Sequence, residues 1–385
     1  MDHVGKLRIG VIFGGRSGEH AVSLMSARSV LAALDPAKYD LVEIGITRRG
    51  TWLVSSDPIG SVVDALEAGD YENAGDLVNA AVLPDPSRPG LWRLPGVSDG
   101  GQLEHFADLD VIFPVLHGTF GEDGTLQGLL ELADMAYVGP GVLAGALAMD
   151  KAVFKDVMRA NGIPVLDWTL VQRGEIERDP EGVMMRCEAV APYPLFTKPA
   201  NLGSSVGITK CRSRADLVEG LMEAAQFDRR VLVERGISGR EIEVSVLGNE
   251  EPLASVPGEV IPHGDFYTYE SKYHDDLSQL NIPAQIPDAI VEQARAFSLA
   301  AYRAIDGAGL ARVDFLLDRE TDELYLNEIN TIPGFTRISM YPKLWEASGL
   351  PYPALCDRLI EYALARKAQR DATSREYTRD PGHDG

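Results

Sequence analysis

The sequence is poor in cysteine and in basic residues, and each shortage excludes a class of protein. The 385 residues include 3 cysteines, Cys187, Cys211 and Cys356, which are widely spaced and form no C-x-x-C pair. Neither a disulfide framework nor a zinc cluster is therefore indicated. A net charge of −22 argues against a nucleic acid or an anionic membrane surface as the main partner.

Long apolar runs are also missing. None reaches about 18 residues, and the N-terminus lacks the charged-then-apolar pattern of a signal peptide. We therefore expect a cytoplasmic protein that does not enter a membrane. With 45% hydrophobic residues the chain has ample material for a core, and at roughly 150 residues per domain its length predicts two or three domains.

The first part of the chain reads as an α/β domain. A β-prone run over 7–13 leads through a glycine-rich segment into a helical pattern over 21–34, and further strands are predicted over 41–47 and 111–116. A helix is expected over 125–133. The segment 55–108 is polar and rich in proline and glycine, so we expect an irregular surface region there.

The second part shows both helical and strand patterns. One helix is predicted over 142–161, ending at Gly162, and another over 289–305. Strands are predicted over 195–198, 231–235 and 241–247, and a large loop over 257–283. Two further strands, 310–317 and 323–329, flank a polar turn. From residue 366 the chain is nearly free of aliphatic residues, so we expect a disordered tail.

The last two predicted strands carry an unusual polar set. Because side chains alternate along a strand, Arg312 and Asp314 share one face, as do Glu328 and Asn330. If the strands pair, the four groups converge. Two carboxylates and an amide oxygen suit Mg²⁺, which keeps waters and phosphates as its other ligands. The alternative interpretation is an ordinary solvated strand face. The strongly apolar residues on the opposite face of the strand argue against it.

A second loop is built from small residues. Residues 201–207 follow the strand that ends at Lys198, and small side chains let backbone N–H groups approach phosphate oxygens. No G-K-[ST] occurs there, so this is not a Walker loop. Taken alone, an ordinary turn is an equally good interpretation. Lys198 and Lys151 gain significance only because they would supply positive charge beside the loop.

Two polar residues lie in the loops of the first domain. Glu19 follows a glycine-rich turn whose spacing does not match G-x-G-x-x-G, and a carboxylate there would repel a pyrophosphate. It can hold a substrate ammonium group or interact with a helix dipole, and the sequence leaves both open. His117 lies in a glycine-rich loop after a predicted strand, and a histidine in a loop is more often structural than catalytic. Its spacing to Glu122 and Asp123 does not indicate a metal site.

In order along the chain, these motifs resemble those of the D-alanine–D-alanine ligases, members of the ATP-grasp superfamily, over roughly residues 7–365. The resemblance rests on the segments 13–20 with 22–23, 116–128, 149–151, 198–199 with 203–207, 269–273, 312–314 and 328–341. Single segments recur in other ATP-grasp enzymes, but the ordered set is specific to this group.

The resemblance implies a three-domain ATP-grasp architecture with an N-terminal parallel-sheet domain. The implied boundaries are 1–139, 140–238 and 239–365, with the tail at 366–385, and ATP lies between the sheets of the last two domains. It also implies two Mg²⁺ (or Mn²⁺) ions per site, possible activation by a monovalent cation, and a homodimer.

The resemblance further assigns roles by motif position. It implies that ATP is bound by Lys151, Lys198, Glu234, Glu241 and Lys272, with Glu234 and Glu241 holding the adenine and the ribose. The implied metal ligands are Asp314, Glu328 and Asn330. The implied catalytic residues are Glu19, Ser204, Tyr273, Arg312 and Gly334. The substrate-binding set is Glu19, His117, Ser339 and Met340.

The implied reaction joins two D-alanine molecules. One carboxylate attacks the γ-phosphate of ATP, and the amine of the second D-alanine attacks the resulting acyl phosphate, making a peptidoglycan precursor. In this family a tyrosine at the position of Tyr273 goes with dipeptide synthesis. The alternatives are D-lactate or D-serine as second substrate, a non-catalytic ATP-binding regulator, and a dinucleotide oxidoreductase, which the glycine spacing disfavours.

Overall fold

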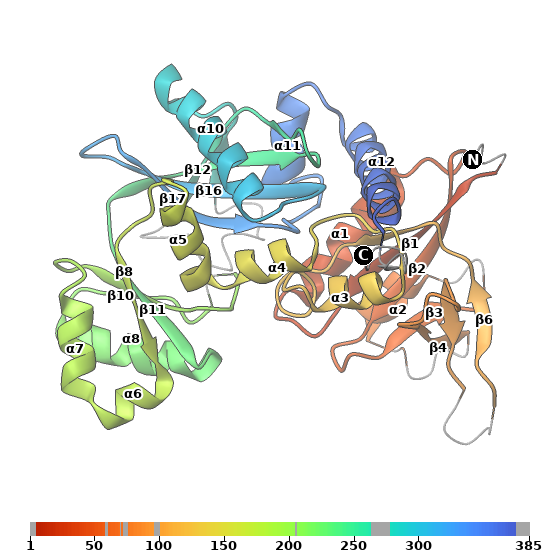
Figure 1. Cartoon of the computed structure of the whole chain (residues 1–385), viewed down its shortest axis with the longest axis horizontal. Coiled ribbons are helices and arrows are strands. Elements are labelled where there is room, and N and C mark those ends of the chain that lie inside the picture. The colour runs from red at the N-terminus through yellow and green to blue at the C-terminus, as the bar shows by residue number, and fades with distance from the viewer. Residues whose placement is uncertain are drawn as a thin grey trace, which may run out of the picture.

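The structure, a computed structural model, describes residues 5–57, 61–69, 71, 76–95, 101–204, 206–262 and 278–374. Three sheets organise these residues into three bodies (Figure 1). We call them the N-terminal, central and C-terminal domains, after the sheets that define them.

The N-terminal domain is built on a seven-stranded sheet in the order β6-β5-β4-β3-β2-β1-β7. β1 (Leu7–Gly14) lies between β2 (Tyr39–Ile46) and β7 (Val111–Pro114) and is parallel to both. α1 (His20–Ala33) follows β1. The predicted parallel core is therefore confirmed, and its central strand is buried, as expected for a strand covered on both faces.

The expectation of an irregular region over 55–108 is wrong. β3 (Trp52–Ser55), β4 (Leu77–Val82), β5 (Leu91–Arg93) and β6 (Glu104–Ala107) extend the sheet by antiparallel pairing, and α2 (Val62–Ala68) lies among them. These strands are short, and Pro84, Pro86 and Pro89 with Gly90 lie in the turn between β4 and β5. Their apolar alternation is therefore too brief to stand out in the sequence.

The predicted helix over 142–161 is two helices. After α3 (Thr125–Leu132), α4 (Val142–Met149) ends at Asp150, and α5 (Lys151–Ala160) begins directly after it. Asp150 has extended backbone angles, and its Oδ1 accepts hydrogen bonds from the backbone N–H groups of Ala152 and Val153, both at 3.1 Å. It is therefore the N-cap that starts α5.

The central domain is a four-stranded antiparallel sheet in the order β10-β9-β11-β8. Its strands are β8 (Trp168–Gln172), β9 (Leu195–Pro199), β10 (Thr209–Cys211) and β11 (Arg230–Arg235). α6 (Arg173–Arg178), α7 (Pro180–Glu188) and α8 (Arg214–Phe227) pack beside it (Figure 1). The domain has its own apolar core, which includes Val171, Leu195, Leu217, Leu221, Val231 and Val233.

The C-terminal domain contains a six-stranded sheet. Its strands are β12 (Gly239–Leu247), β13 (Leu253–Ala254), β14 (Gly258–Pro262), β15 (Ser278–Asn281), β16 (Leu310–Asp318) and β17 (Leu324–Asn330). The loop expected over 257–283 thus carries a strand at each end, and residues 263–277 lie outside the described residues. α10 (Asp288–Ala304) packs on this sheet with α4 and α5.

The predicted pairing of the last two strands is confirmed. β16 and β17 are antiparallel, with Arg312 opposite Asn330 and Asp314 opposite Glu328, and a bulge follows Asp314. All four polar residues therefore belong to one region of the sheet, as the alternation of side chains predicted.

The last two described helices, α11 (Met340–Ala347) and α12 (Tyr352–Asp371), return to the N-terminal domain. Residues of both helices share one apolar core with β1, β7 and α1, including Val11, Phe13, Phe113, Tyr341, Leu355 and Leu359. α12 continues to Asp371, so the prediction that a disordered tail begins at residue 366 is wrong for its first turn and a half. The prediction relied on the scarcity of aliphatic residues after 366. The last turns of α12 are instead held by ion pairs from Arg366 and Arg370 to Glu131.

Candidate active site

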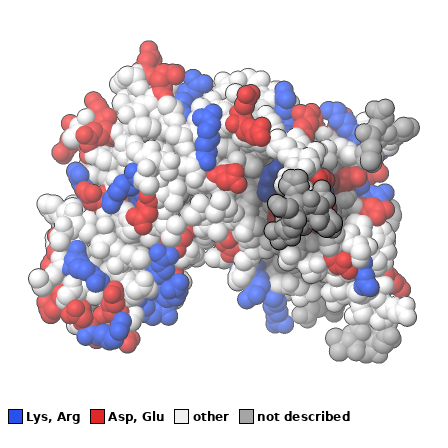
Figure 2. Space-filling model, viewed as in Figure 1, with Lys and Arg blue, Asp and Glu red and all other residues white. Residues whose placement is uncertain are grey.

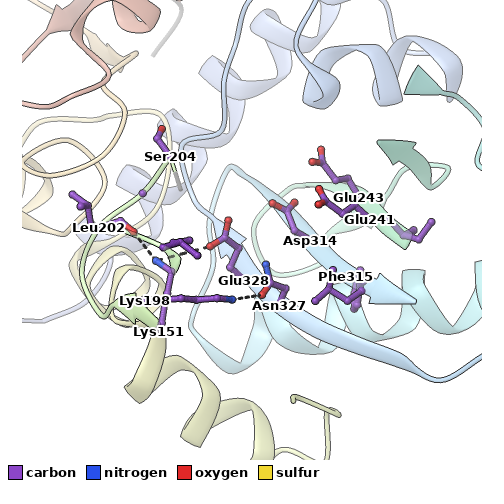
Figure 3. A pocket seen from close by; sticks show the side chains of 14 residues that line it. Lys151, Lys198, Leu202, Ser204, Glu241, Glu243, Asp314, Phe315, Asn327 and Glu328 are labelled. Carbon is purple, nitrogen blue, oxygen red and sulfur yellow. Dashed lines mark hydrogen bonds and ion pairs between the residues drawn. The ribbon is translucent and has the colours of Figure 1, made fainter. Parts of the chain in front are cut away.

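A cleft separates the central sheet from the C-terminal sheet (Figure 3). One wall is basic and comes from α5, β9 and the loop 201–207. The other is acidic and comes from β12, β16 and β17. The polar residues that line it are Lys151, Lys198, Ser204, Glu241, Glu243, Asp314, Asn327 and Glu328.

The basic wall carries two amines. Lys198 Nζ donates to Glu234 Oε2 at 2.6 Å and to Asn327 Oδ1 at 3.4 Å. Lys151 Nζ donates to the Leu202 carbonyl at 2.6 Å and lies 4.0 Å from Glu328 Oε2. The two lysines that the sequence singled out are thus brought together, and both reach across the cleft toward the opposite wall (Figure 3).

Glu234, which the resemblance assigned to adenine, is buried behind Lys198 and pairs with two amines. Burial alone would raise the pKa of this carboxyl, but Lys155 and Lys198 outweigh burial, so the pKa is lowered and the group is ionised. Lys155 was not predicted from the sequence. Its only signal is a position one helical turn after Lys151, which does not by itself show that the side chain is 1% exposed.

The acidic wall is centred on Asp314. Arg312 donates to both Asp314 carboxylate oxygens, at 2.7 and 2.6 Å, and lies 2.9 Å from Glu243. The Asn330 amide donates to Asp314 Oδ2 at 2.9 Å. Burial would lower the pKa of Arg312, but Asp314 and Glu243 raise it, so the guanidinium stays protonated. Glu243, which lies opposite Asp314 on β12, was not predicted from the sequence.

The residues on this wall fit a hard divalent cation. Asp314 and Glu328 are cross-strand partners, and Asn330, whose amide nitrogen faces Asp314, also carries an amide oxygen. Two carboxylates and an amide leave positions for water and phosphate, which is the pattern that Mg²⁺ favours. Among the described residues, no group of three or more His, Cys, Asp or Glu side chains is arranged to hold a metal by itself.

At one end of the cleft, the N-terminal domain meets the loop 201–207. Ser204 Oγ donates to the Glu19 carboxylate, and Ser204 has a left-handed backbone with φ of 54°. A side chain at Gly118 would come within 2.6 Å of Glu19 Oε2, so only glycine leaves room for this carboxylate. The hollow between these residues is a further pocket that includes Gly203.

His117 is held by protein on both sides of its ring. Nδ1 lies 2.9 Å from the Ile332 carbonyl, and Nε2 lies 3.1 Å from Ser26 Oγ. Burial lowers the pKa of the imidazole, so the ring is neutral and donates from Nδ1. Substrate binding by His117 stays a prediction. The hydrogen bonds themselves show that the ring ties the N-terminal domain to the segment after β17.

Glu122 is a third residue, after Lys155 and Glu243, that was not predicted to belong to the site. Its Oε1 accepts a hydrogen bond from the Gly118 N–H at 2.9 Å. Burial and the neighbouring Glu19 raise the pKa of this carboxyl to about 8. The group therefore carries a proton at neutral pH and stands behind the loop that shapes the Glu19 pocket.

The segment after β17 leads into the N-terminus of α11. Ser339 precedes the helix, and Met340 is its first residue. The Thr336 N–H donates to Ser339 Oγ at 3.1 Å, and a side chain at Gly334 would come within 3.2 Å of that oxygen. Backbone N–H groups at a helix start suit a carboxylate.

Two predicted site residues, Lys272 and Tyr273, lie outside the described residues.

Figure 2 shows basic and acidic side chains interspersed over the visible face. In the part of the chain that the structure describes, no helix combines the length and apolar character needed to span a bilayer.

Two family models match the chain. Residues 8–140 match the model described as "D-ala D-ala ligase N-terminus", and residues 157–361 match "D-ala D-ala ligase C-terminus". Similar curated proteins carry the same name. The D-alanine–D-alanine ligase of Heliobacterium modesticaldum is 50% identical over 96% of this chain and 98% of its own length. That of Natranaerobius thermophilus is 46% identical over 97% and 99%.

Solved structures agree with this pattern. The D-alanine–D-alanine ligase of Coxiella burnetii aligns with a TM-score of 0.79 and 36% identity, over 95% of this chain and 96% of that one. A D-Ala:D-Ser ligase of Enterococcus faecalis aligns with a TM-score of 0.82 and 34% identity, over 93% and 100%.

Proposed function

The chain belongs to the D-alanine–D-alanine ligase family, and from this premise we propose how its cleft makes D-alanyl-D-alanine. The enzyme is a ligase with the ATP-grasp fold, and it joins two D-alanine molecules. The observation that carries the proposal is the cleft itself. It brings two lysines opposite a carboxylate pair, and it opens toward Glu19 and Ser204 at one end.

In the first step, the ammonium group of one D-alanine is held by the Glu19 carboxylate, which Ser204 orients. Lys151 and Lys198 bind the phosphates of ATP, with Glu241 proposed for the ribose. Any adenine contact by Glu234 must use a lone pair that its two lysines leave open. The substrate carboxylate then attacks the γ-phosphorus, ADP leaves, and an acyl phosphate forms. Positioning and charge stabilisation provide the catalysis.

We propose Asp314, Glu328 and Asn330 as the ligands of two Mg²⁺ or Mn²⁺ ions. When bound, such ions would neutralise the phosphate oxygens during the transfer. Arg312 already holds Asp314 in a fixed orientation through two hydrogen bonds. The protein therefore keeps one ligand in place before the cation arrives.

In the second step, the carboxylate of the other D-alanine binds at the start of α11, to Ser339 and the Met340 N–H. Its neutral amine attacks the acyl carbonyl, and phosphate leaves from the tetrahedral intermediate. Arg312 and the Gly334 N–H are proposed to stabilise the oxyanion of that intermediate. Preorganised donors of this kind commonly contribute about 10²–10³-fold to kcat.

The lid residues are proposed from the family resemblance. Lys272 would reach the γ-phosphate, and Tyr273 would join Glu19 and Ser204 in closing the site. The tyrosine favours an amine acceptor, so Tyr273→Phe should gain D-alanyl-D-lactate synthesis. An unchanged product ratio would count against this role. The D-serine alternative is not favoured, because the relatives with 46–50% identity are named for D-alanine.

Several finer assignments are proposals as well. We propose that the enzyme acts in the cytoplasm as a homodimer, supplies a peptidoglycan precursor, and responds to a monovalent cation. Residues 1–139 and 239–365 are proposed as the outer domains and 140–238 as the central one. However, the apolar side chains of α4 and α5 pack in the core of the C-terminal sheet, so the central domain is better begun at β8.

The test is product formation by the purified full chain. With Mg²⁺, ATP and D-alanine, ADP release should accompany D-alanyl-D-alanine, and D-lactate or D-serine offered together with D-alanine should be used poorly. ATP binding without ADP release would instead support the non-catalytic regulator. A mainly ester or D-serine product would overturn the choice of acceptor.

A further inference from the structure

α5 and β11 meet through charged groups, although each belongs to a different apolar core. Phe154 and Met158 of α5 pack in the core of the C-terminal domain. Val231 and Val233 of β11 pack in the separate core of the central domain. Figure 1 shows α5 between the two sheets. Four residues connect the two elements, and we call them the polar joint: Asp150, Lys155, Arg230 and Glu234.

The first contact of the joint is at the start of α5. One Asp150 oxygen caps the helix, and the other accepts a hydrogen bond from Arg230. The side chains of Asp150 and Arg230 are 12% and 17% exposed, so solvent screens this pair only partly. A single carboxylate therefore fixes where α5 begins and attaches that point to β11.

The second contact lies one helical turn further along. Lys155 pairs with Glu234, and the side chains of both are 1% exposed. The other Glu234 oxygen accepts from Lys198 at 2.6 Å. α5 is thus attached to β11 at two points, and the second point also holds a lysine of the cleft wall.

The same region anchors the loop 201–207. The Lys151 N–H donates to the Ala200 carbonyl, and the Ala200 N–H donates to the Arg230 carbonyl, both at 3.0 Å. Asp228 accepts hydrogen bonds from the backbone and the amide of Asn201, at 2.8 and 2.9 Å, and from the Arg230 N–H at 3.2 Å. The position of Arg230 therefore determines both the start of α5 and the root of the loop.

We propose that the polar joint positions the phosphate-binding groups, with Asp150 and Arg230 as positioning residues that touch no substrate themselves. The proposal rests on the proposed function, because it assumes that Lys151, Lys198 and the loop 201–207 bind the ATP phosphates. Loss of the Asp150–Arg230 contact should let α5 turn relative to β11. Lys151 would then leave the Leu202 carbonyl, and nucleotide binding would weaken while the D-alanine pocket at Glu19 stays intact.

The experiment compares Arg230→Met, Arg230→Lys, Asp150→Asn and a matched control, Arg214→Met. Arg214 belongs to the same domain and is also held in ion pairs, in its case with two carboxylates, but it is 46% exposed and its partners, Glu181 and Glu188, lie on α7 rather than on the cleft wall. Binding of a non-hydrolysable ATP analogue with Mg²⁺ is measured by calorimetry. ADP release gives KM for ATP and for D-alanine, and melting temperature reports folding.

Arg230→Met should weaken nucleotide affinity and raise the KM for ATP by about 10- to 30-fold, equivalent to one lost charged hydrogen bond. The KM of the first D-alanine should change by less than about twofold. Arg230→Lys should recover most of the affinity, and Arg214→Met should match the wild type. Asp150→Asn keeps the helix cap. It should also raise the KM for ATP while leaving the KM for the first D-alanine nearly unchanged, but by less than Arg230→Met does. Asp150→Asn combined with Arg230→Met should be no worse than Arg230→Met alone.

Unchanged nucleotide affinity in a folded Arg230→Met protein would overturn the proposal. So would an equal loss for both substrates that follows only the melting temperature, which is the result of a purely structural contact. If Arg230→Met does not fold, Asp150→Asn decides by the same criteria. Nucleotide binding does not depend on the acceptor. Absence of ADP release from the wild type would therefore count against the proposed function, while calorimetry would still test the joint.

Discussion

The C-terminal domain contacts its two neighbours in chemically different ways. Toward the N-terminal domain it shares a continuous apolar core, in which α11 and α12 pack against β1, β7 and α1. Toward the central domain it presents the polar joint. Separating the C-terminal domain from the N-terminal domain would expose a large apolar surface. Separating it from the central domain would only require the charged groups of the polar joint to exchange protein partners for water. The outer domains therefore behave as one body, to which the central domain is attached as a second.

The division matches the two substrates only in part. Glu19, Ser339 and Met340, proposed for D-alanine, lie on the two outer domains, which we call the fused body, while Lys198 and the loop 201–207 belong to the central domain. Lys151, Glu241 and the proposed metal ligands also lie on the fused body, so only changes there that leave these cleft residues in place should affect chemistry or stability without first weakening ATP binding. Four predictions test this comparison, beginning with the largest effect.

Arg312→Lys should give the largest loss. Lysine keeps the positive charge between Asp314 and Glu243 but cannot reproduce the two parallel hydrogen bonds of the guanidinium. We expect kcat to fall by about 10²–10³-fold, with nucleotide affinity within a few-fold of the wild type, measured by ADP release and calorimetry. Arg319→Lys, on an exposed turn of the same domain, is the control. A change confined to ATP affinity would break the comparison.

Leu359→Ala should destabilise the fused body without touching the cleft. Leu359 is 0% exposed in the core shared by the two outer domains. Its truncation should cost about 2–5 kcal/mol of unfolding free energy, measured by denaturant titration. The ATP affinity of the folded protein should not change. Met222→Ala, on the exposed side of α8, should cost under about 0.5 kcal/mol.

Glu122→Gln tests a partly buried acid within the fused body. Its folded pKa of about 8 exceeds the ordinary value of 4.5, so the folded protein keeps a proton that the unfolded chain releases. The stability that this proton provides is present below pH 4.5 and is lost as the pH rises toward 8. The variant should lack this decline, giving a difference on the order of 2–4 kcal/mol between pH 5 and 8. Parallel pH profiles of unfolding free energy would contradict the assignment.

Arg366→Met should have the smallest effect. Its guanidinium donates to the Gly139 carbonyl at 3.2 Å and to Tyr137 Oη at 2.9 Å, and it pairs with Glu131 at the rim of the shared core. Because the core itself holds the two domains, we expect a loss of only about 1 kcal/mol in unfolding free energy. A loss as large as that from Leu359→Ala would mean that charges, rather than apolar packing, hold the fused body together.

Local patterns in the sequence were sufficient for some parts of the fold. The alternation along β16 and β17 predicted their pairing and brought Asp314 and Glu328 together. The strands β3 to β6 were missed because each is too short for its alternation to exceed that of a polar loop. The break at Asp150 was missed because apolar periodicity continues on both sides of a single capping residue.

Contacts within the site depended on tertiary arrangement. The partners of His117 lie 91 and 215 residues away, at Ser26 and Ile332, and no local pattern specifies such pairs. Lys155 could not be linked to Glu234 without knowing how α5 packs on β11. Motif resemblance brought together the residues that face the substrates, whereas the residues that support them emerged only from the structure.

The single residue between α4 and α5 makes this connection intolerant of length changes. Most junctions between helices accept an inserted residue, because a surface loop absorbs it. Here Asp150 is the entire connection. One extra residue would rotate α5 by about 100° relative to α4, and Lys151 and Lys155 would face away from their partners together. Homologous chains should therefore differ in length within the surface turn 84–89, between β4 and β5, far more readily than at this junction.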